Sequence, residues 1–165
     1  MRSVVFLLGT AAWVLLDGAL AQKMILMENF DPEQAAGIWY SVERTGTLYN
    51  NSATCTMYEV KHKDGMVYEV ELTYRSKSNT MMKNTFRILE DSDHPAQFFF
   101  ADQDNQKVAV RFLGTDYKNW NVCFGYVYGN IPVYGISSRT PTLDPKYLEE
   151  AMAIMKGSTE KCTPM

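Results

Sequence analysis

The sequence predicts an all-β fold: an eight-stranded antiparallel up-and-down barrel with one C-terminal α-helix packed on its outside. Three observations predict it: eight short segments rich in β-branched and aromatic residues, short polar turns between them, and one amphipathic helical pattern near the end of the chain. Short connections make sequential strands pair antiparallel. With no long crossover, a closed barrel is favoured because closure removes the exposed edges of the sheet.

The N-terminal pattern predicts a secretory signal peptide, cleaved after residues 1–21. Arg2 precedes an apolar run from Val4 to Leu16, and Ala19-Leu20-Ala21 is a small-x-small cleavage site. A membrane anchor is disfavoured because the run is about a dozen residues long, whereas a spanning helix needs roughly 20. Residues 22–165 are predicted to form a single domain. We therefore expect a secreted, extracellular product.

The charge balance excludes some classes of partner. The chain has 16 basic and 19 acidic residues, for a formal net charge of −3, and no basic cluster. This balance disfavours nucleic acid or an anionic membrane as the main partner. No later segment is apolar for long enough to predict a membrane span.

The eight predicted strands are separated by turn residues such as His62-Lys63-Asp64-Gly65 and Gly129-Asn130. The fourth and fifth are the least regular, because Thr80-Met81-Met82-Lys83 alternates poorly and Phe98-Phe99-Phe100 cannot all point one way. In order, the strands are predicted at residues 38–45, 54–61, 66–75, 80–89, 97–102, 107–113, 119–128 and 132–138.

The helical pattern follows Pro141 and runs from residue 142 to residue 157. Pro145 stands near the first turn, and Gly157 follows the last periodic residue. One stripe at helical spacing is apolar and is predicted to pack on the outside of the barrel as ordinary core. Its members are Tyr147, Leu148, Ala151, Met152 and Met155.

The first strand opens with Gly37-Ile38-Trp39-Tyr40. A glycine at the floor of a barrel lets the chain turn sharply and approach neighbouring backbone, and the Trp39 indole then plugs the narrow end. Arg139, at the end of the last strand, is predicted to stack on this indole, because a closed meander brings its last strand beside its first. Gly37, Trp39 and Arg139 are the predicted barrel-closing residues.

Three stretches resemble, in order, the signature regions of the lipocalin family: Gly37-Ile38-Trp39-Tyr40, Thr115-Asp116-Tyr117 and Arg139. The resemblance covers nearly all of residues 28–165. Ser138-Arg139-Thr140-Pro141, followed by a Leu-x-Pro helix start, is most similar to the apolipoprotein D and arthropod bilin-binding branch. Two features depart from that branch: Ala35-Ala36 replaces its usual tyrosine, and its second disulfide is absent.

The chain has three cysteines, so at most one intramolecular bridge forms in an oxidising compartment. The resemblance implies that Cys55 pairs with Cys162, which leaves Cys123 unpaired. Asn50-Asn51-Ser52 is a sequon that makes Asn50 a predicted glycosylation acceptor in a loop.

The resemblance also implies an open-mouthed cup that holds a small apolar molecule. In the seventh strand, the face with Trp120, Val122, Phe124 and Tyr126 is predicted to meet the helix, so the face with Cys123 looks into the cup. Tyrosines with apolar bodies and hydroxyl tips favour a flat or ring-containing ligand. The predicted lining consists of Tyr58, Val60, Tyr68, Val70, Leu72, Tyr74, Val110, Phe112, Cys123, Gly125, Val133 and Gly135.

The sequence offers little for catalysis or metal binding, so no enzyme, metal site or required cofactor is predicted. Its two histidines, His62 and His94, lie in predicted loops without a second ligand at metal spacing. One enzymatic hypothesis remains, an isomerase that uses Cys123 as nucleophile. The resemblance disfavours it, because the pocket cysteine of the lipocalin-type isomerase lies on a different strand. The simpler interpretation of Cys123 is a small buried hydrophobe.

The main hypothesis is a secreted lipocalin that binds and transports a small hydrophobic ligand without catalysis. A linear tetrapyrrole such as biliverdin is the first ligand hypothesis, followed by a carotenoid, retinoid, steroid or fatty acid. The alternative is a secreted recognition or defence module that acts through protein partners. The sequence leaves the ligand, its bonding to Cys123 and the formation of a homodimer open.

Overall fold

The structure, a computed structural model, describes residues 26–45, 54–101, 107–127 and 131–160. The predicted signal peptide at residues 1–21, the predicted acceptor Asn50 and the thiol of Cys162 lie outside these ranges. Cleavage, glycosylation and the bridge between Cys55 and Cys162 therefore stay predictions. Cys55 itself is exposed and has a free thiol in the structure.

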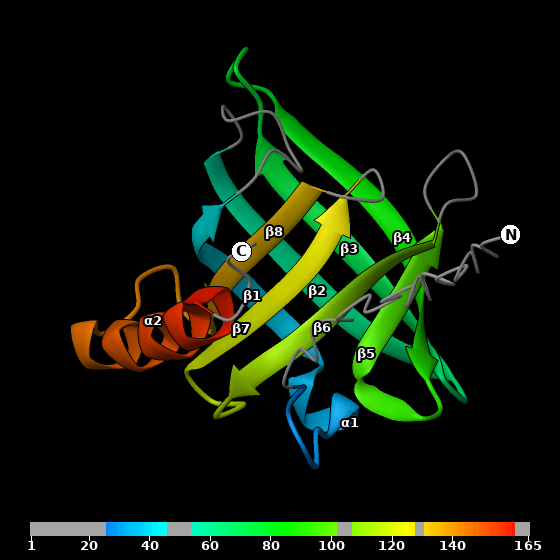
Figure 1. Cartoon of the computed structure of the whole chain (residues 1–165). Helices are drawn as coiled ribbons and strands as arrows, with labels where there is room; N and C mark the ends of the chain where they lie inside the picture. The colour runs from blue at the N-terminus through cyan, green and yellow to red at the C-terminus, as the bar shows by residue number, and fades with distance from the viewer. Residues whose placement is uncertain (1–25, 46–53, 102–106, 128–130, 161–165) are drawn as a thin grey trace, which may run out of the picture.

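The eight strands form one closed antiparallel barrel, in which each strand pairs with the next and β8 pairs back with β1 (Figure 1). The predicted fold class is confirmed. The strands are β1 Gly37–Thr45, β2 Thr54–Asp64, β3 Val67–Arg75, β4 Met81–Asp91, β5 His94–Ala101, β6 Lys107–Thr115, β7 Trp120–Val127 and β8 Ile131–Ser138.

The boundaries differ from the prediction mainly around β2 and β5. β2 continues to Asp64, which places His62 in a strand instead of a loop. β5 begins at His94 instead of residue 97, because the turn before it is a tight one in which the Asp91 carboxylate accepts a hydrogen bond from the Asp93 amide at 3.0 Å. A side chain that bonds its own backbone two residues on makes such a short turn stable.

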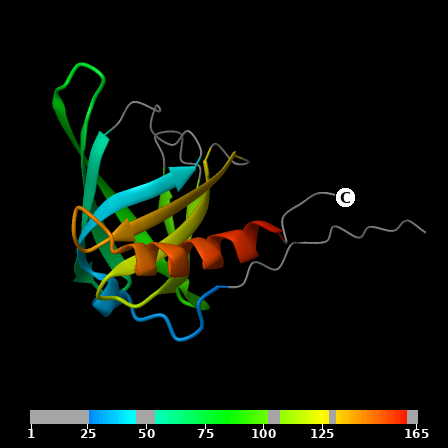
Figure 2. The same ribbon diagram turned by 90° about the vertical axis from the view of Figure 1, so that its left-hand side faces the viewer.

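Helix α2, Pro145–Glu160, lies on the outside of the barrel against β6, β7 and β8 (Figures 1 and 2). It begins where the Asp144 carboxylate accepts a hydrogen bond from the Lys146 amide at 2.9 Å, and it continues past the predicted end at Gly157. A Cβ on Gly114 would stand 2.8 Å from Cδ1 of Ile154, so the glycine in β6 lets the helix approach the sheet closely.

The predicted apolar stripe of α2 packs on the outward faces of β7 and β8. Val122 and Phe124 of β7 and Ile136 of β8 are almost wholly buried there, with Ala151 of the helix against them. Burial of this kind contributes about 25 cal/mol per Å² of apolar surface removed from water. It also settles the orientation of β7, because residues that alternate with Val122 and Phe124 must face the barrel interior.

The floor of the barrel is closed by Trp39 and Arg139. The Trp39 indole is 1% exposed, and the guanidinium carbon of Arg139 lies 3.7 Å from its ring centroid. The indole Nε1 donates a hydrogen bond to the carbonyl oxygen of Ala35 at 2.7 Å. Gly37 has φ +98°, and a Cβ there would stand 3.1 Å from Nη1 of Arg139. The glycine thus permits both the left-handed backbone and the approach of the guanidinium.

Arg139 fastens three chain segments through backbone carbonyl oxygens. Its Nη2 donates to Gln34 at 2.8 Å, its Nη1 to Ala36 at 2.8 Å and Ile38 at 3.1 Å, and its Nε to Tyr117 at 3.0 Å. These carbonyls belong to the segment before β1, to β1 itself and to the β6–β7 turn. A planar guanidinium with several fixed donors suits this arrangement better than an ammonium group.

A short helix that the sequence pattern does not predict, α1 Pro32–Ala35, lies across the same end of the barrel (Figure 1). The Asp31 carboxylate caps it by accepting hydrogen bonds from the amides of Glu33 and Gln34. Just before it, the Phe30 ring stacks on Phe112 with centroids 4.6 Å apart. Phe30, Ala35, Tyr68, Ala96 and Phe98 form a buried cluster that seals this end.

Replacing Arg139 with Met is expected to lower the free energy of unfolding by roughly 2–4 kcal/mol. Four backbone carbonyl oxygens, some of them partly buried, lose the hydrogen-bond donor that the guanidinium supplies. Urea denaturation measures the change. Arg87→Met, at an exposed position on β4, is the matched control, with an expected change within about 0.5 kcal/mol. Equal losses in both variants would contradict the role assigned to Arg139.

Candidate functional site: a cavity inside the barrel

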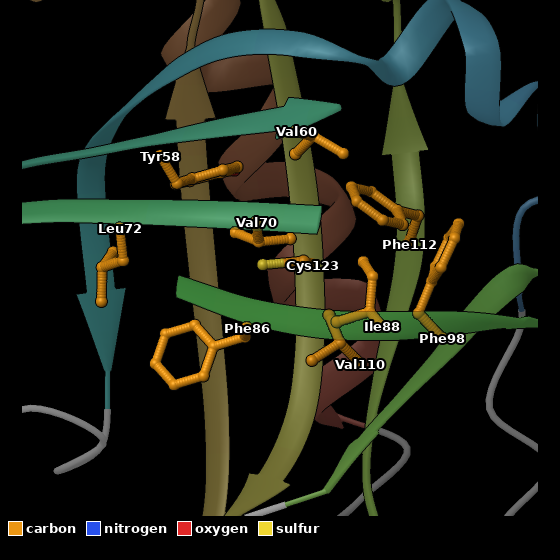
Figure 3. Close-up of a pocket in the computed structure, with 10 residues that line it drawn as sticks. All are labelled: Tyr58, Val60, Val70, Leu72, Phe86, Ile88, Phe98, Val110, Phe112 and Cys123. Carbon is orange, nitrogen blue, oxygen red and sulfur yellow. The ribbon is translucent and has the colours of Figure 1, made fainter. Parts of the chain in front are cut away.

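A cavity of about 190 Å³ lies inside the barrel above this floor. Its walls come from β2 to β7, and Figure 3 shows the lining side chains directed into the interior. None of the described residues that line it is charged. The lining consists of Tyr58, Val60, Val70, Leu72, Phe86, Ile88, Phe98, Val110, Phe112 and Cys123.

Seven of these lining residues are in the predicted set: Tyr58, Val60, Val70, Leu72, Val110, Phe112 and Cys123. The other three, Phe86, Ile88 and Phe98, were missed. They lie on β4 and β5, the two strands whose alternation is least regular in sequence. The structure places the Phe98 side chain, which is 4% exposed, in the lining of the cavity.

Five predicted lining residues do not line this cavity. Tyr68 is 3% exposed but belongs to the floor cluster. Gly135 lies behind the Cys123 thiol, since a Cβ there would stand 3.1 Å from Sγ. At Gly125 a Cβ would meet the Ala109 carbonyl oxygen at 2.8 Å, so close strand packing requires the glycine. Val133 is buried and Tyr74 half-buried, both outside the lining.

A group of uncharged polar side chains stands at the deep end of the cavity. The Tyr58 hydroxyl donates a hydrogen bond to Oγ of Ser137 at 2.7 Å, and the side-chain amide of Asn121 lies 3.4 Å from the same hydroxyl. Asn121 and Ser137 are 1% and 3% exposed. Burial raises the pKa of Tyr58 above its ordinary value, so its hydroxyl stays protonated at any physiological pH.

The Cys123 thiol faces the cavity from β7 (Figure 3). The accessible part of the thiol faces the cavity and not bulk solvent, and this burial raises the pKa of the thiol to about 11. The group is therefore a neutral thiol near pH 7, without the thiolate that nucleophilic attack requires. The structure thus argues against the isomerase hypothesis.

The ionisable side chains near the floor make structural contacts outside the cavity. Nδ1 of His62 lies 2.6 Å from a carboxylate oxygen of Glu33, and the imidazole stacks on Tyr68 with centroids 4.8 Å apart. These contacts tie α1 to β2 and β3. Within the described residues, no cluster of His, Cys, Asp and Glu is placed to hold a metal ion. In the same part of the chain, no helix is long and apolar enough to cross a membrane.

Comparison with known proteins supports the fold. The structure is similar to insecticyanin from the tobacco hornworm Manduca sexta, with a TM-score of 0.69 at 18% identity over 84% of this chain and 78% of that one. It is similar to lobster apocrustacyanin A1, with a TM-score of 0.64 at 18% identity over 77% and 72% of the two chains. A major allergen from cockroaches gives 0.64 at 17% identity over 78% and 81%.

At these identities the likeness shows a shared fold, the lipocalin-type barrel with its C-terminal helix. No protein-family model matches the sequence, and no curated protein matches it. Membership of the lipocalin family, and the branch of that family indicated by the sequence, are therefore matters for proposal.

The raised pKa of Cys123 predicts how its reactivity depends on pH. In a Cys55→Ser, Cys162→Ser variant, the rate of reaction with N-ethylmaleimide is expected to rise about tenfold per pH unit from pH 7 to pH 9 without a plateau, because the thiolate fraction keeps growing below the pKa. N-acetylcysteine amide, a free thiol with an ordinary pKa of about 8.5, is the control, and its rate begins to level off in this range. A plateau for Cys123 near pH 8 would contradict the prediction.

Proposed function

We propose that this protein is a secreted lipocalin that binds and transports a small hydrophobic ligand inside its barrel, without catalysis. The observation that carries the proposal is the cavity above a closed floor, lined among the described residues by uncharged side chains only. Such a site gains affinity from burying apolar ligand surface in a preformed hollow. The sequence pattern of residues 1–21 supports export.

The size of the cavity bears on the ligand. At about 190 Å³ it is smaller than the roughly 300 Å³ at which the usual range of ligand sites begins. A compact ligand is enclosed completely, whereas a larger one projects through the mouth of the barrel. We place a linear tetrapyrrole such as biliverdin first, on the sequence resemblance to the bilin-binding branch and on the ring-rich lining. Such a molecule would be enclosed only in part.

The two other hypotheses have less support. A recognition module that acts through protein partners does not need an open cavity, so the cavity favours a carrier over it. An enzyme that used Cys123 as its nucleophile would need this residue as a thiolate. Because the pKa of Cys123 is raised, the thiol is protonated near neutral pH.

Adding biliverdin to the purified protein is expected to shift the visible absorption band of the pigment and to quench tryptophan emission, because the ligand enters a barrel that holds Trp39 at its floor. Val70→Phe fills part of the cavity and is expected to weaken binding about tenfold or more. Glu71→Gln, one residue along β3 on the outer face, where Glu71 pairs with Lys83 at 2.8 Å, is the matched control with unchanged binding. A colourless protein with no band shift would exclude the tetrapyrrole, and failure with a whole panel of apolar ligands would overturn the carrier function.

Protein secreted from a eukaryotic host is expected to begin at Gln22, to carry a glycan on Asn50 and to contain a bridge between Cys55 and Cys162. Intact-mass spectrometry before and after reduction, with and without enzymatic deglycosylation, tests each of the three. Retention of residues 1–21 in the released protein would contradict the signal peptide. Two alkylatable thiols at positions 55 and 162 without reduction would contradict the bridge.

A further inference from the structure

The polar group at the deep end of the cavity has a chemistry of its own. Tyr58 reaches across the interior from β2 to β7 and β8, where Asn121 and Ser137 each lie one residue from the floor end of their strand. The hydroxyl is therefore next to the floor, and the rest of the lining is hydrocarbon, aromatic or thiol. We propose that this end recognises one uncharged hydrogen-bond donor, an O–H or N–H group, on an otherwise hydrocarbon ligand, and that the Tyr58 oxygen accepts it.

The direction of the hydrogen bond follows from the partners of Tyr58. Its single proton is donated to Oγ of Ser137 at 2.7 Å, whereas the Asn121 amide lies farther away, at 3.4 Å. A phenolic hydroxyl both donates and accepts, so the oxygen keeps acceptor capacity that the long Asn121 contact satisfies poorly. A ligand that brings a donor gains a bond here; a ligand that brings only an acceptor competes with Ser137 for the one proton.

A charged group does not suit this end. Burying an ionised carboxylate beside uncharged groups costs several kcal/mol. The cation below the floor, Arg139, directs four N–H groups to backbone carbonyl oxygens and covers the Trp39 ring with its face. It is committed to closing the barrel. The deep end therefore favours a ligand that enters with a neutral alcohol, lactam or pyrrole-type N–H group over a ligand that enters with its carboxylate.

This inference rests on the proposed carrier function and narrows its ligand class. Two isomeric probes test it: 1-decanol, which carries a donor, and 1-methoxynonane, which has the same atoms but only an acceptor. Their dissociation constants are measured by displacement of the neutral dye N-phenyl-1-naphthylamine. An alcohol is costlier to remove from water than an ether, so a purely apolar pocket prefers the ether. We expect the protein instead to bind the alcohol about fivefold more tightly.

Three variants sharpen the test. Tyr58→Phe removes the acceptor and is expected to invert the preference in favour of the ether. Ser137→Ala frees the Tyr58 proton, so affinity for the ether is expected to rise relative to the alcohol. Val70→Ala changes the wall without touching the polar group and is expected to weaken both isomers to the same degree. Thermal unfolding of each variant checks that it is folded. If Tyr58→Phe does not fold, Ser137→Ala tests the inference in its place.

The outcomes separate the two proposals. Tighter binding of the alcohol, lost in Tyr58→Phe or reduced in Ser137→Ala, supports the inference. Equal binding of the isomers, or tighter binding of the ether by the unaltered protein, overturns it and leaves the carrier function standing. No binding of the dye or of either isomer overturns both.

Discussion

The stack of Arg139 on Trp39 is the contact on which the usable interior of this protein depends. A barrel of strands is open at both ends. If water enters the interior from both ends, an apolar ligand buries little of its surface and binds weakly. Here the indole fills one end and the guanidinium fastens it to the segment before β1, to β1 and to the β6–β7 turn. The hydrogen bonds to backbone make the floor rigid, because one planar guanidinium holds four acceptors from these segments at the same time.

The cavity owes its existence to an unequal division of side chains across β7 and β8. Val122, Phe124 and Ile136 fill the outer face under α2, while Cys123 and Gly135 stand on the inner one. The large side chains stabilise the fold by burial against the helix, so the inner face need not supply the whole core. A sheet with bulky residues on both faces would be stable and full. This one places part of its core outside the barrel and leaves a hollow within.

Most of the architecture was predictable from sequence because it depends on local patterns: alternation for strands, short turns for antiparallel order and a 3.6-residue stripe for α2. The inner and outer faces of β7 followed from the same alternation. Phe98 was missed because a run of three phenylalanines shows no alternation. Phe86 and Ile88 were missed because Thr80-Met81-Met82-Lys83, at the start of the predicted strand, alternates poorly, so pairing with the neighbouring strands was needed to place them. The role of Gly125 was also out of reach, since it depends on how closely Ala109 of the next strand approaches. Helix α1 is one turn long, too short for periodicity to reveal it.

The cavity combines two demands that are hard to meet together, an apolar interior and a choice among apolar ligands. Dispersion and hydrophobic burial favour nearly any oily molecule that fits, so they give affinity without much discrimination. Discrimination has to come from shape or from a polar group whose loss is costly. A fixed charge would give the strongest selection but would have to be buried without a ligand, at a cost of several kcal/mol. A neutral group already bonded to its neighbours, as Tyr58 is to Ser137, avoids that cost in the empty barrel. It still penalises a ligand that covers it without offering a partner, and so a small cavity with uncharged walls is able to select by hydrogen bonding.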